Sequence, residues 1–474
     1  MFHIERGALR RAARGQELDF DAGFLLRVLT AITVLGVFAR LWASIRRRLA
    51  GAYTRAILEF ALFVYVLTYF IGVTAMFIFR EAAIDASFVG EMYVPPDLPY
   101  WHMWLISLLP LLAALVVGGM ATRRSKAQKN TVQVVAKEPD TFLPVALATG
   151  AVLVLLVFYL RTGLIQLIGN ALDLSYYAAH DLWEQRAAVV SDLNAVSAGL
   201  IYGTVPCLAV TLLLYKGEHQ LVVRIAAVGA VVLAVLLNLG MFLGGALAAA
   251  ALIFLWVQAQ VRDSKLLTPR RIVLLGVLTL LYLWYQTLKP GMAQASIFTS
   301  VIQVFMRMPI AMPYLFDLAR THAVMNASVP LPVALAYYMF PSETVKYNVD
   351  EPQPAFVEAW FYWGPIGALA LLLVILAGTA IVTSILMKRF GRSAGVVRVG
   401  LFYSMFHLLY YFFQVDVYEV FNSSYSVFFP LLVPMAISAV LVFRRTPARG
   451  VPMRPSGATN RFVAGGSWHD LIEP

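Results

Sequence analysis

Six basic residues and two histidines stand out because they lie in two long segments that otherwise contain few cations. The segments are 161–195 and 289–359, and the residues are Arg161, Arg186, Lys289, Arg307, Arg320, Lys346, His180 and His322. Arginine is permanently charged, and its forked guanidinium matches the oxygen atoms of phosphate groups. Such cations stabilise the negative charge that builds on a diphosphate leaving group while a glycosidic bond breaks. Chemistry on a lipid-diphosphate-linked sugar is therefore our first expectation.

Arg307 is the cation whose surroundings are most informative. It lies in FMRMPIAMPYLFDL, where apolar residues flank it on both sides. We interpret it as a diphosphate clamp at the membrane boundary, and the alternative is an arginine that merely reaches toward lipid headgroups. Arg186, in HDLWEQR, equally suits a solvated pair with Asp181 or Glu184. Arg320 has the same two interpretations.

Three further residues of these segments are possible contributors to the same site. His322 shares the short stretch ARTH with Arg320, and His180 precedes the stretch that contains Arg186. Lys346 lies late in the second segment. All three can donate hydrogen bonds to phosphate oxygens when they are protonated.

Glu358 is the best placed acid for accepting a proton from an attacking hydroxyl group. It lies where the second segment joins an apolar run that starts near residue 360. A carboxylate at that depth is costly to bury and more often marks a functional site than not. The alternative is a carboxylate that caps the N-terminus of the following helix. Asp350 and Glu351 are adjacent, so their side chains diverge and a solvated turn is expected there.

Metal or cofactor chemistry is not indicated. The sequence shows no HxxE, HExxH or paired-carboxylate pattern, and the single cysteine, Cys207, lies in an apolar run. One cysteine also excludes a disulfide framework. His407 shares a late apolar run with Tyr410, Tyr411 and Gln414, and a hydrogen-bonded core histidine is the simpler interpretation.

Composition places these residues in a membrane protein. Hydrophobic residues make up 60% of the 474 positions and charged residues 13%, against the roughly 25% charged residues of soluble domains. No globular core hides that much apolar surface, so lipid must cover it. Basic residues outnumber acidic ones by 37 to 26. They cluster in short stretches between apolar runs, which indicates membrane topology and not nucleic-acid binding.

The apolar runs predict a polytopic all-α bundle, because about 20 apolar residues form a helix that crosses the hydrocarbon layer. The predicted spans are 56–79, 103–121, 142–160, 196–215, 221–238, 241–260, 272–288, 360–387, 399–415 and 424–443. A further candidate, 24–43, contains Arg27 and Arg40, so it either spans the membrane or lies in the interface.

Lys and Arg distribution predicts the orientation. Basic linkers face the cytoplasm, and these are 44–55, 122–141, 261–271 and 388–398 together with the tail after 444. The alternate linkers, including 161–195 and 289–359, face outward. Within the second of these, 297–322 is expected to form amphipathic helices on the membrane surface.

Three regions follow from this plan. Residues 1–55 form an N-terminal segment without an expected cleavable signal peptide, 56–443 form the transmembrane domain, and 444–474 form a basic tail that is predicted to be disordered.

The stretch 340–373, FPSETVKYNVDEPQPAFVEAWFYWGPIGALALLL, resembles the signature region of bacterial O-antigen and exopolysaccharide polymerases, the Wzy-like family. The family pattern runs through a small residue, two apolar residues, Glu, an aromatic residue and G-x-x-G. Here it is occupied by Ala355, Phe356, Val357, Glu358, Ala359, Trp360, Gly364 and Gly367. The two glycines are expected to let a neighbouring helix pack closely.

Two departures from related patterns are informative. O-antigen ligases, the sister branch, carry a histidine where this chain has Gln353, which favours a polymerase. Family members often carry an arginine in a T-G-S-R-like stretch, whereas LGMFLGGALAAA (239–250) keeps the glycines without the arginine.

The resemblance implies a GT-C-like, inverting, metal-independent glycosyltransferase without a cofactor in the bacterial inner membrane. It would transfer a glycan from undecaprenyl diphosphate to a lipid-linked repeat unit, with membrane lipid and a chain-length regulator protein as further partners. Arg186, Arg307 and Arg320 would hold the diphosphate, and Glu358 would orient or deprotonate the acceptor. The alternatives are an O-antigen ligase, a transporter of lipid-linked oligosaccharides, and a dolichyl-phosphate-sugar enzyme. The last would need an acidic motif after the first span, where 80–102 has only separated acids.

Overall fold

The computed structural model describes most of the predicted bundle and part of the outward segments. The described residues are 22–49, 53–80, 99–125, 140–160, 162–179, 185, 188–189, 194–240, 244–262, 273, 276–277, 309–321, 331, 335, 353–390, 395–423 and 425–445. All regular structure within them is helical, so the all-α prediction is confirmed. Most of the predicted span 272–288, most of the segment 289–352 and the tail 446–474 lie outside the described residues.

Seven helices among the described residues are long and apolar enough to cross a membrane. They are α2 (Ala22–Arg48), α3–η1–α4 (Tyr53–Tyr65, Val66–Phe70, Ile71–Phe79), α6–α7 (Tyr100–Ser107, Leu109–Ser125), α8 (Phe142–Tyr159), α12–η2–α13 (Ala195–Gly199, Leu200–Thr204, Val205–Leu213), α14 (Gln220–Gly240) and α21 (Ala355–Arg389). The protein is therefore a multi-pass membrane protein.

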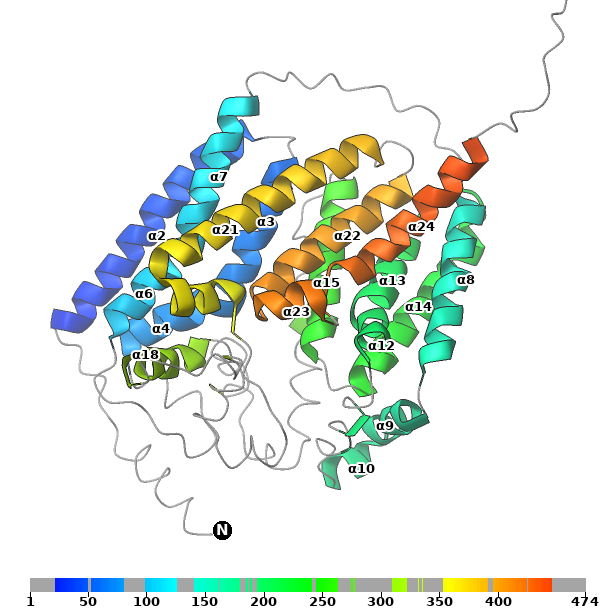
Figure 1. The fold of residues 1–474 in the computed structure, drawn as a ribbon, viewed down its shortest axis with the longest axis horizontal. Helices are drawn as coiled ribbons and strands as arrows, with labels where there is room; N and C mark the ends of the chain where they lie inside the picture. Colours follow the sequence, from blue (N-terminus) through cyan, green and yellow to red (C-terminus); the bar gives the residue numbers. More distant parts are fainter. Residues whose placement is uncertain are drawn as a thin grey trace, which may run out of the picture.

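Three more helices run between the same two ends of the bundle (Figure 1). They are α15 (Gly244–Arg262), α22 (Gly395–Phe412) and α24 (Phe428–Arg445). They occupy the predicted spans 241–260, 399–415 and 424–443. Successive long helices alternate in direction, as the predicted topology requires.

Helix α2 favours a span over an interfacial helix for residues 24–43. Its 27 residues extend about 40 Å at 1.5 Å per residue, enough to cross the hydrocarbon layer. Arg27, which is 7% exposed, donates from Nε to the carbonyl oxygen of Ile78 at 3.1 Å. Ile78 lies in the last turn of α4, where carbonyl groups attract a cation. This arginine therefore joins two helices and does not prevent a span.

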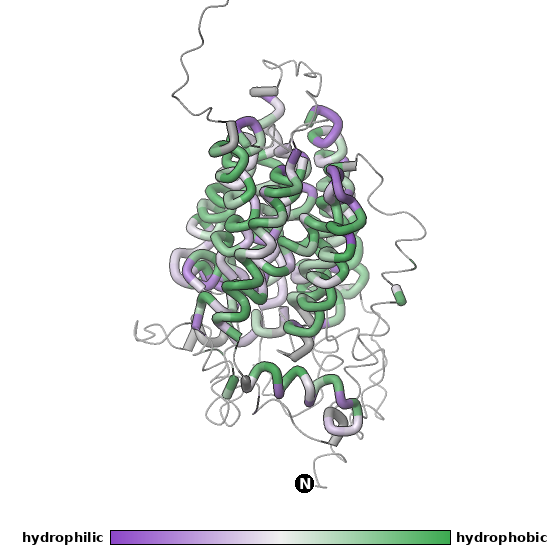
Figure 2. The backbone as a smooth tube through the Cα atoms, turned by 90° about the vertical axis from the view of Figure 1, so that its right-hand side faces the viewer, coloured by the Kyte–Doolittle hydropathy of each residue, from purple (hydrophilic) through white to green (hydrophobic). Residues whose placement is uncertain are grey.

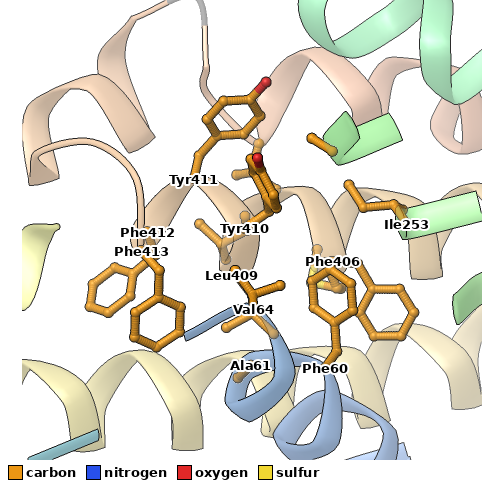
Figure 3. Packing of buried hydrophobic residues seen from close by; sticks show 14 of the residues in the cluster. Phe60, Ala61, Val64, Ile253, Phe406, Leu409, Tyr410, Tyr411, Phe412 and Phe413 are labelled. Atoms are coloured by element: carbon orange, nitrogen blue, oxygen red, sulfur yellow. The ribbon is translucent and has the colours of Figure 1, made fainter. Parts of the chain in front are cut away.

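Lipid-facing surface and protein core separate clearly. Val157 and Phe158 on α8 are 70% and 80% exposed, and Leu221 on α14 is 73% exposed. The helices are hydrophobic over most of their length, with hydrophilic residues toward their ends (Figure 2). The core lies between α3, α15 and α22, where Phe60 stacks on Phe406 with ring centroids 4.4 Å apart (Figure 3).

The two ends of the bundle differ in the elements and charges that lie there; the end opposite the basic one is called the outer end, after the predicted orientation. The basic C-terminal turns of α2 and α21 lie at one end, which we call the basic end. Three short helices lie at the opposite, outer end (Figure 1): α9 (Thr162–Leu172), α10 (Leu174–Ala179) and α18 (Met312–Thr321). Between α9 and α10, hydrogen bonds from the Ser175 hydroxyl and from backbone N–H groups lower the pKa of Asp173.

Helix α21 is sharply kinked, and the kink corrects our expectation for its glycines. Gly364 has φ 70° and ψ −172° inside the helix, and Pro365 follows it. No neighbouring atom lies within 4 Å of where a Gly364 Cβ would stand, whereas a Gly367 Cβ would clash with Trp363 of the same helix. The prediction that both glycines admit a neighbouring helix is therefore wrong. They allow α21 to fold back on itself, into a short arm (355–363) and a long arm (366–389).

We expect Gly364→Ala to destabilise the protein by about 1–3 kcal/mol, because a side chain is strained at this positive φ. Gly378→Ala is the matched control, since Gly378 lies in the long arm with equally open space around its Cβ position and no positive φ. Thermal unfolding in detergent, followed by intrinsic fluorescence, measures both variants. Equal unfolding temperatures would show that the kink imposes no strain.

Candidate functional site

The short arm of α21 is anchored in a cluster of aromatic side chains. Phe356 is fully buried, and its ring meets those of Tyr65 and Tyr69 edge-on with centroids 5.8 and 5.5 Å apart. Phe413, just beyond α22, is 6.2 Å from the same ring. Each such pair contributes about 0.5–1.5 kcal/mol beyond the area that it buries. The end of the second outward segment is thus held firmly to the bundle.

A π-helix, η1, brings helix α18 to the same cluster. Tyr69 lies in η1, and its hydroxyl group donates to Sδ of Met312, the first residue of α18, at 3.2 Å. A second contact follows one turn later, where the Phe316 ring lies 4.5 Å from the Trp360 ring. Single π-turns occur frequently at functional sites. Here the π-turn lets one helix contact both α18 and the short arm.

Glu358 lies in the first turn of α21 and faces a different short helix, α23 (Val417–Asn422). Its Oε2 accepts a hydrogen bond from the backbone N–H of Val417 at 3.3 Å. Asp416 caps α23 by accepting from the Glu419 N–H at 2.8 Å, and it is near enough for its charge to interact with that of Glu358. Glu358 is half-buried. No side chain caps the N-terminus of α21 itself; Glu358 instead accepts a hydrogen bond at the N-terminus of α23, close to the carboxyl group of Asp416.

An exposed tyrosine ring lies near this pair of carboxyl groups, and two further exposed aromatic residues, Trp363 and Tyr418, are near neighbours in the chain of Tyr362 and Asp416. Tyr362, which is 49% exposed, lies close enough to interact electrostatically with Glu358 and Asp416, and it hydrogen-bonds to the backbone of Leu331. Trp363 is 66% exposed and Tyr418 is 68% exposed. Leu331 itself is buried. The site thus combines hydrogen-bond acceptors with aromatic surface at the outer end.

The predicted cations are only partly visible. The backbone of Arg320 lies in α18, one turn beyond Phe316, and its side chain lies outside what the structure describes. The other predicted diphosphate contacts and possible contributors also lie outside the described residues, and these are Arg186, Arg307, His180, His322 and Lys346. Their convergence on Glu358 stays a prediction.

Sequence reasoning missed the role of the segment that follows α22. Asp416 and Val417 contact Glu358 although 58 and 59 positions separate them from it in the chain. The only signal was their position directly after a predicted span, which many solvated residues share.

His407 holds the far end of this segment. It is 1% exposed, and its Nε2 lies 3.1 Å from the carbonyl oxygen of Tyr425. The Tyr425 ring lies between those of Tyr411 and Tyr202, with centroids 4.7 and 5.3 Å away. In Figure 3, the Tyr411 side chain points away from those of Phe412 and Phe413. His407 is thus a hydrogen-bonded core histidine, as expected, and its partner lies just beyond α23.

A second π-helix, η2, completes the tyrosine stack. It contains Tyr202, and its Thr204 hydroxyl donates to the carbonyl oxygen of Phe429 at 2.9 Å. Gly199 and Gly203 allow this close approach, since a Cβ at either position would meet Phe429 or Pro430. The start of α24 is therefore fixed against η2, and α23 is held between α22 and α24.

Metal-ligating side chains do not gather in the described part of the chain. No group of three His, Cys, Asp or Glu residues is found there. Cys207 is fully buried.

Comparison with known proteins identifies no relative. No protein-family model matches the chain, no curated protein matches it, and no solved structure matches it.

We expect His407→Gln to preserve the position of α23 and His407→Asn to loosen it. Glutamine places its amide nitrogen near the position of the histidine Nε2, whereas asparagine is too short to reach the Tyr425 carbonyl. Val420 of α23 is fully buried, so a Val420→Cys reporter should resist maleimide labelling. Losing one hydrogen bond costs about 1 kcal/mol, which makes opening about fivefold more frequent in the Asn variant.

Labelling rates in detergent measure this opening, and the buried Cys207 keeps the background low. Equal rates in the Gln and Asn variants would show that the hydrogen bond does not hold the segment.

Proposed function

We propose that this protein is a polysaccharide polymerase of the GT-C-like class that acts at the outer face of the bacterial inner membrane. It transfers a glycan from undecaprenyl diphosphate to a lipid-linked repeat unit. The observation that carries the proposal is the position of Glu358, a half-buried carboxyl group at the outer end of a multi-pass bundle. A lipid-linked substrate reaches such a site from the bilayer while its sugars remain in water.

The reaction is a single displacement with inversion. An acceptor hydroxyl oxygen attacks the anomeric carbon, forming the new glycosidic bond while the bond to the diphosphate oxygen breaks. Glu358 accepts the hydroxyl proton, and the diphosphate leaves with the electron pair of the broken bond. Arg186, Arg307 and Arg320 stabilise that charge. No metal ion or cofactor takes part in this scheme.

The surroundings of Glu358 suit a sugar acceptor. Asp416 supplies a second carboxylate that accepts hydroxyl hydrogen bonds, and its own position is set by capping α23. Tyr362 lies close enough to both carboxyl groups to interact with them electrostatically, and its ring combines an apolar body with a polar edge. The backbone position of Arg320 on α18, which is docked through Phe316 to Trp360, supports a role for this arginine.

The family assignment rests on the sequence pattern around 355–367. The kink at Gly364 gives the G-x-x-G part of that pattern a structural role, because it turns Glu358 toward α23. Gln353, at the position of the ligase histidine, is buried, and it favours transfer to a repeat unit over transfer to lipid A core. A chain-length regulator protein is the further partner that a polymerase needs.

A transporter of lipid-linked oligosaccharides is the second candidate. Transporters use interrupted helices near their substrate, and α21 is interrupted at Gly364 while η1 and η2 interrupt two other spans. A deletion strain distinguishes the two. Lipid-linked repeat units accumulate on the cytoplasmic side if a transporter is lost and on the outer side if a polymerase is lost.

We expect Arg307→Ala to reduce polymerisation by two to three orders of magnitude, because a lost transition-state cation costs about 3–4 kcal/mol.

Glu358→Gln should reduce polymerisation by about 10²–10⁴-fold through loss of the base. Polymer ladders on gels, at matched membrane levels, report both. Arg123→Gln, at the basic end of α7, is the control and should leave the ladder unchanged.

A normal ladder from Arg307→Ala would remove that residue from the mechanism. A normal ladder from Glu358→Gln would overturn the proposed chemistry at this site.

A further inference from the structure

The lipid-facing side of α2 joins an apolar track to a group of cations. The apolar side chains of this track are each more than half exposed, and they are Leu25, Leu26, Leu29, Ile32, Val37 and Leu41. Arg40, Arg47 and Arg48 are exposed at the basic end of the same helix. Residues seven apart lie on one side of a helix, so Arg40 and Arg47 share a face.

Arg40 lies farther from the basic end of α2 than Arg47 and Arg48 do. It precedes Arg47 by two helical turns, or about 10 Å, and its exposed neighbours are Val37 and Leu41. A charge facing hydrocarbon is costly, so the guanidinium extends toward the headgroup layer and needs an anion there. Free solvation in a cytoplasmic loop does not explain this position.

Among the described residues that pack beside the end of α2, Glu59 is an acid that already has two partners. Glu59 Oε1 accepts from Arg46 at 2.5 Å and from Arg55 at 2.9 Å. Arg47 donates from Nε to the carbonyl oxygen of Ala43 in its own helix. No carboxylate of the described residues is paired with Arg40 or Arg47.

Trp42 marks the level of the headgroups. Its ring lies parallel to that of Phe38, with centroids 6.4 Å apart, and faces α7, where a Cβ at Gly118 would lie 3.5 Å from it. Tryptophan prefers the membrane–water interface. Along the helix, Trp42 lies between Arg40 and Arg47. The Arg40 side chain therefore reaches the phosphate layer from the hydrocarbon side, and the Arg47 side chain reaches it from the water side.

We propose that Arg40, Arg47 and Arg48 bind the phosphate headgroup of an anionic phospholipid whose acyl chains lie along the apolar track of α2. Arginine pairs with phosphate oxygens through two parallel hydrogen bonds, and basic residues beside spans attract anionic lipids. This site lies at the opposite end of the bundle from Glu358 and does not depend on the proposed polymerase activity.

Native mass spectrometry of the protein in neutral detergent, with added phosphatidylglycerol or phosphatidylcholine, tests the site. The wild-type protein should retain more phosphatidylglycerol. Arg40→Gln and Arg47→Gln should each weaken that retention about fivefold, as expected for one basic residue at an anionic surface. Arg40→Lys keeps the charge and should retain the lipid. Arg389→Gln is the control, because Arg389 lies over the Phe390 ring at the end of α21.

Three outcomes would overturn the proposal. The first is that the wild-type protein retains phosphatidylglycerol and phosphatidylcholine equally. The second is that Arg389→Gln loses as much phosphatidylglycerol as the Arg40 and Arg47 variants. The third is that inorganic phosphate stabilises the protein as much as phosphatidylglycerol does, which would indicate a site for free anions. A wild-type dimer that Arg40→Gln converts to a monomer would assign this face to a second copy of the chain instead. Monodisperse gel filtration of each variant excludes misfolding as the cause.

Discussion

The backbone of Gly364 is the constraint on which the outer half of the structure depends. Its positive φ interrupts the α21 helix, so the first nine residues turn back into the bundle instead of continuing the span. That turn buries Phe356 among the tyrosines of α3 and η1 and directs Glu358 to the N-terminus of α23. A straight helix would leave Glu358 without this partner. The geometry of the candidate site therefore follows from one residue without a side chain.

Irregular helices recur through the bundle, and side chains satisfy the carbonyl groups beside them. The Tyr65 hydroxyl donates to the carbonyl oxygen of Ser107, where α6 ends. Thr204 donates to Phe429 at the start of α24, and His407 lies within hydrogen-bond distance of the Tyr425 carbonyl. Unsatisfied backbone groups are costly in a bilayer, so irregular backbone persists only where protein groups satisfy it. These contacts connect the bundle to the segments that form its outer end.

The two ends of the protein suit two different anions. At the outer end, the proposed polymerase meets a lipid diphosphate with cations from the outward segments, beside the carboxyl groups of Glu358 and Asp416. At the basic end, the arginines of one helix form the proposed site, and they would bind the phosphodiester of a phospholipid. At the outer end, the exposed Tyr362 lies close to the carboxyl groups of Glu358 and Asp416. Catalysis is therefore proposed at that end, and simple lipid binding at the other.

The sequence by itself determined the membrane class, the all-α fold, the places of most spans and which end carries the cations, because hydropathy and charge act locally along the chain. It also identified Glu358 as a residue of interest. Only the tertiary structure decided that Arg27 joins α2 to α4, that Gly364 bends a helix and does not admit a neighbour, and that Asp416 and Val417 adjoin Glu358. Those features depend on contacts between residues far apart in sequence and on one backbone angle, and neither leaves a periodic or compositional signal.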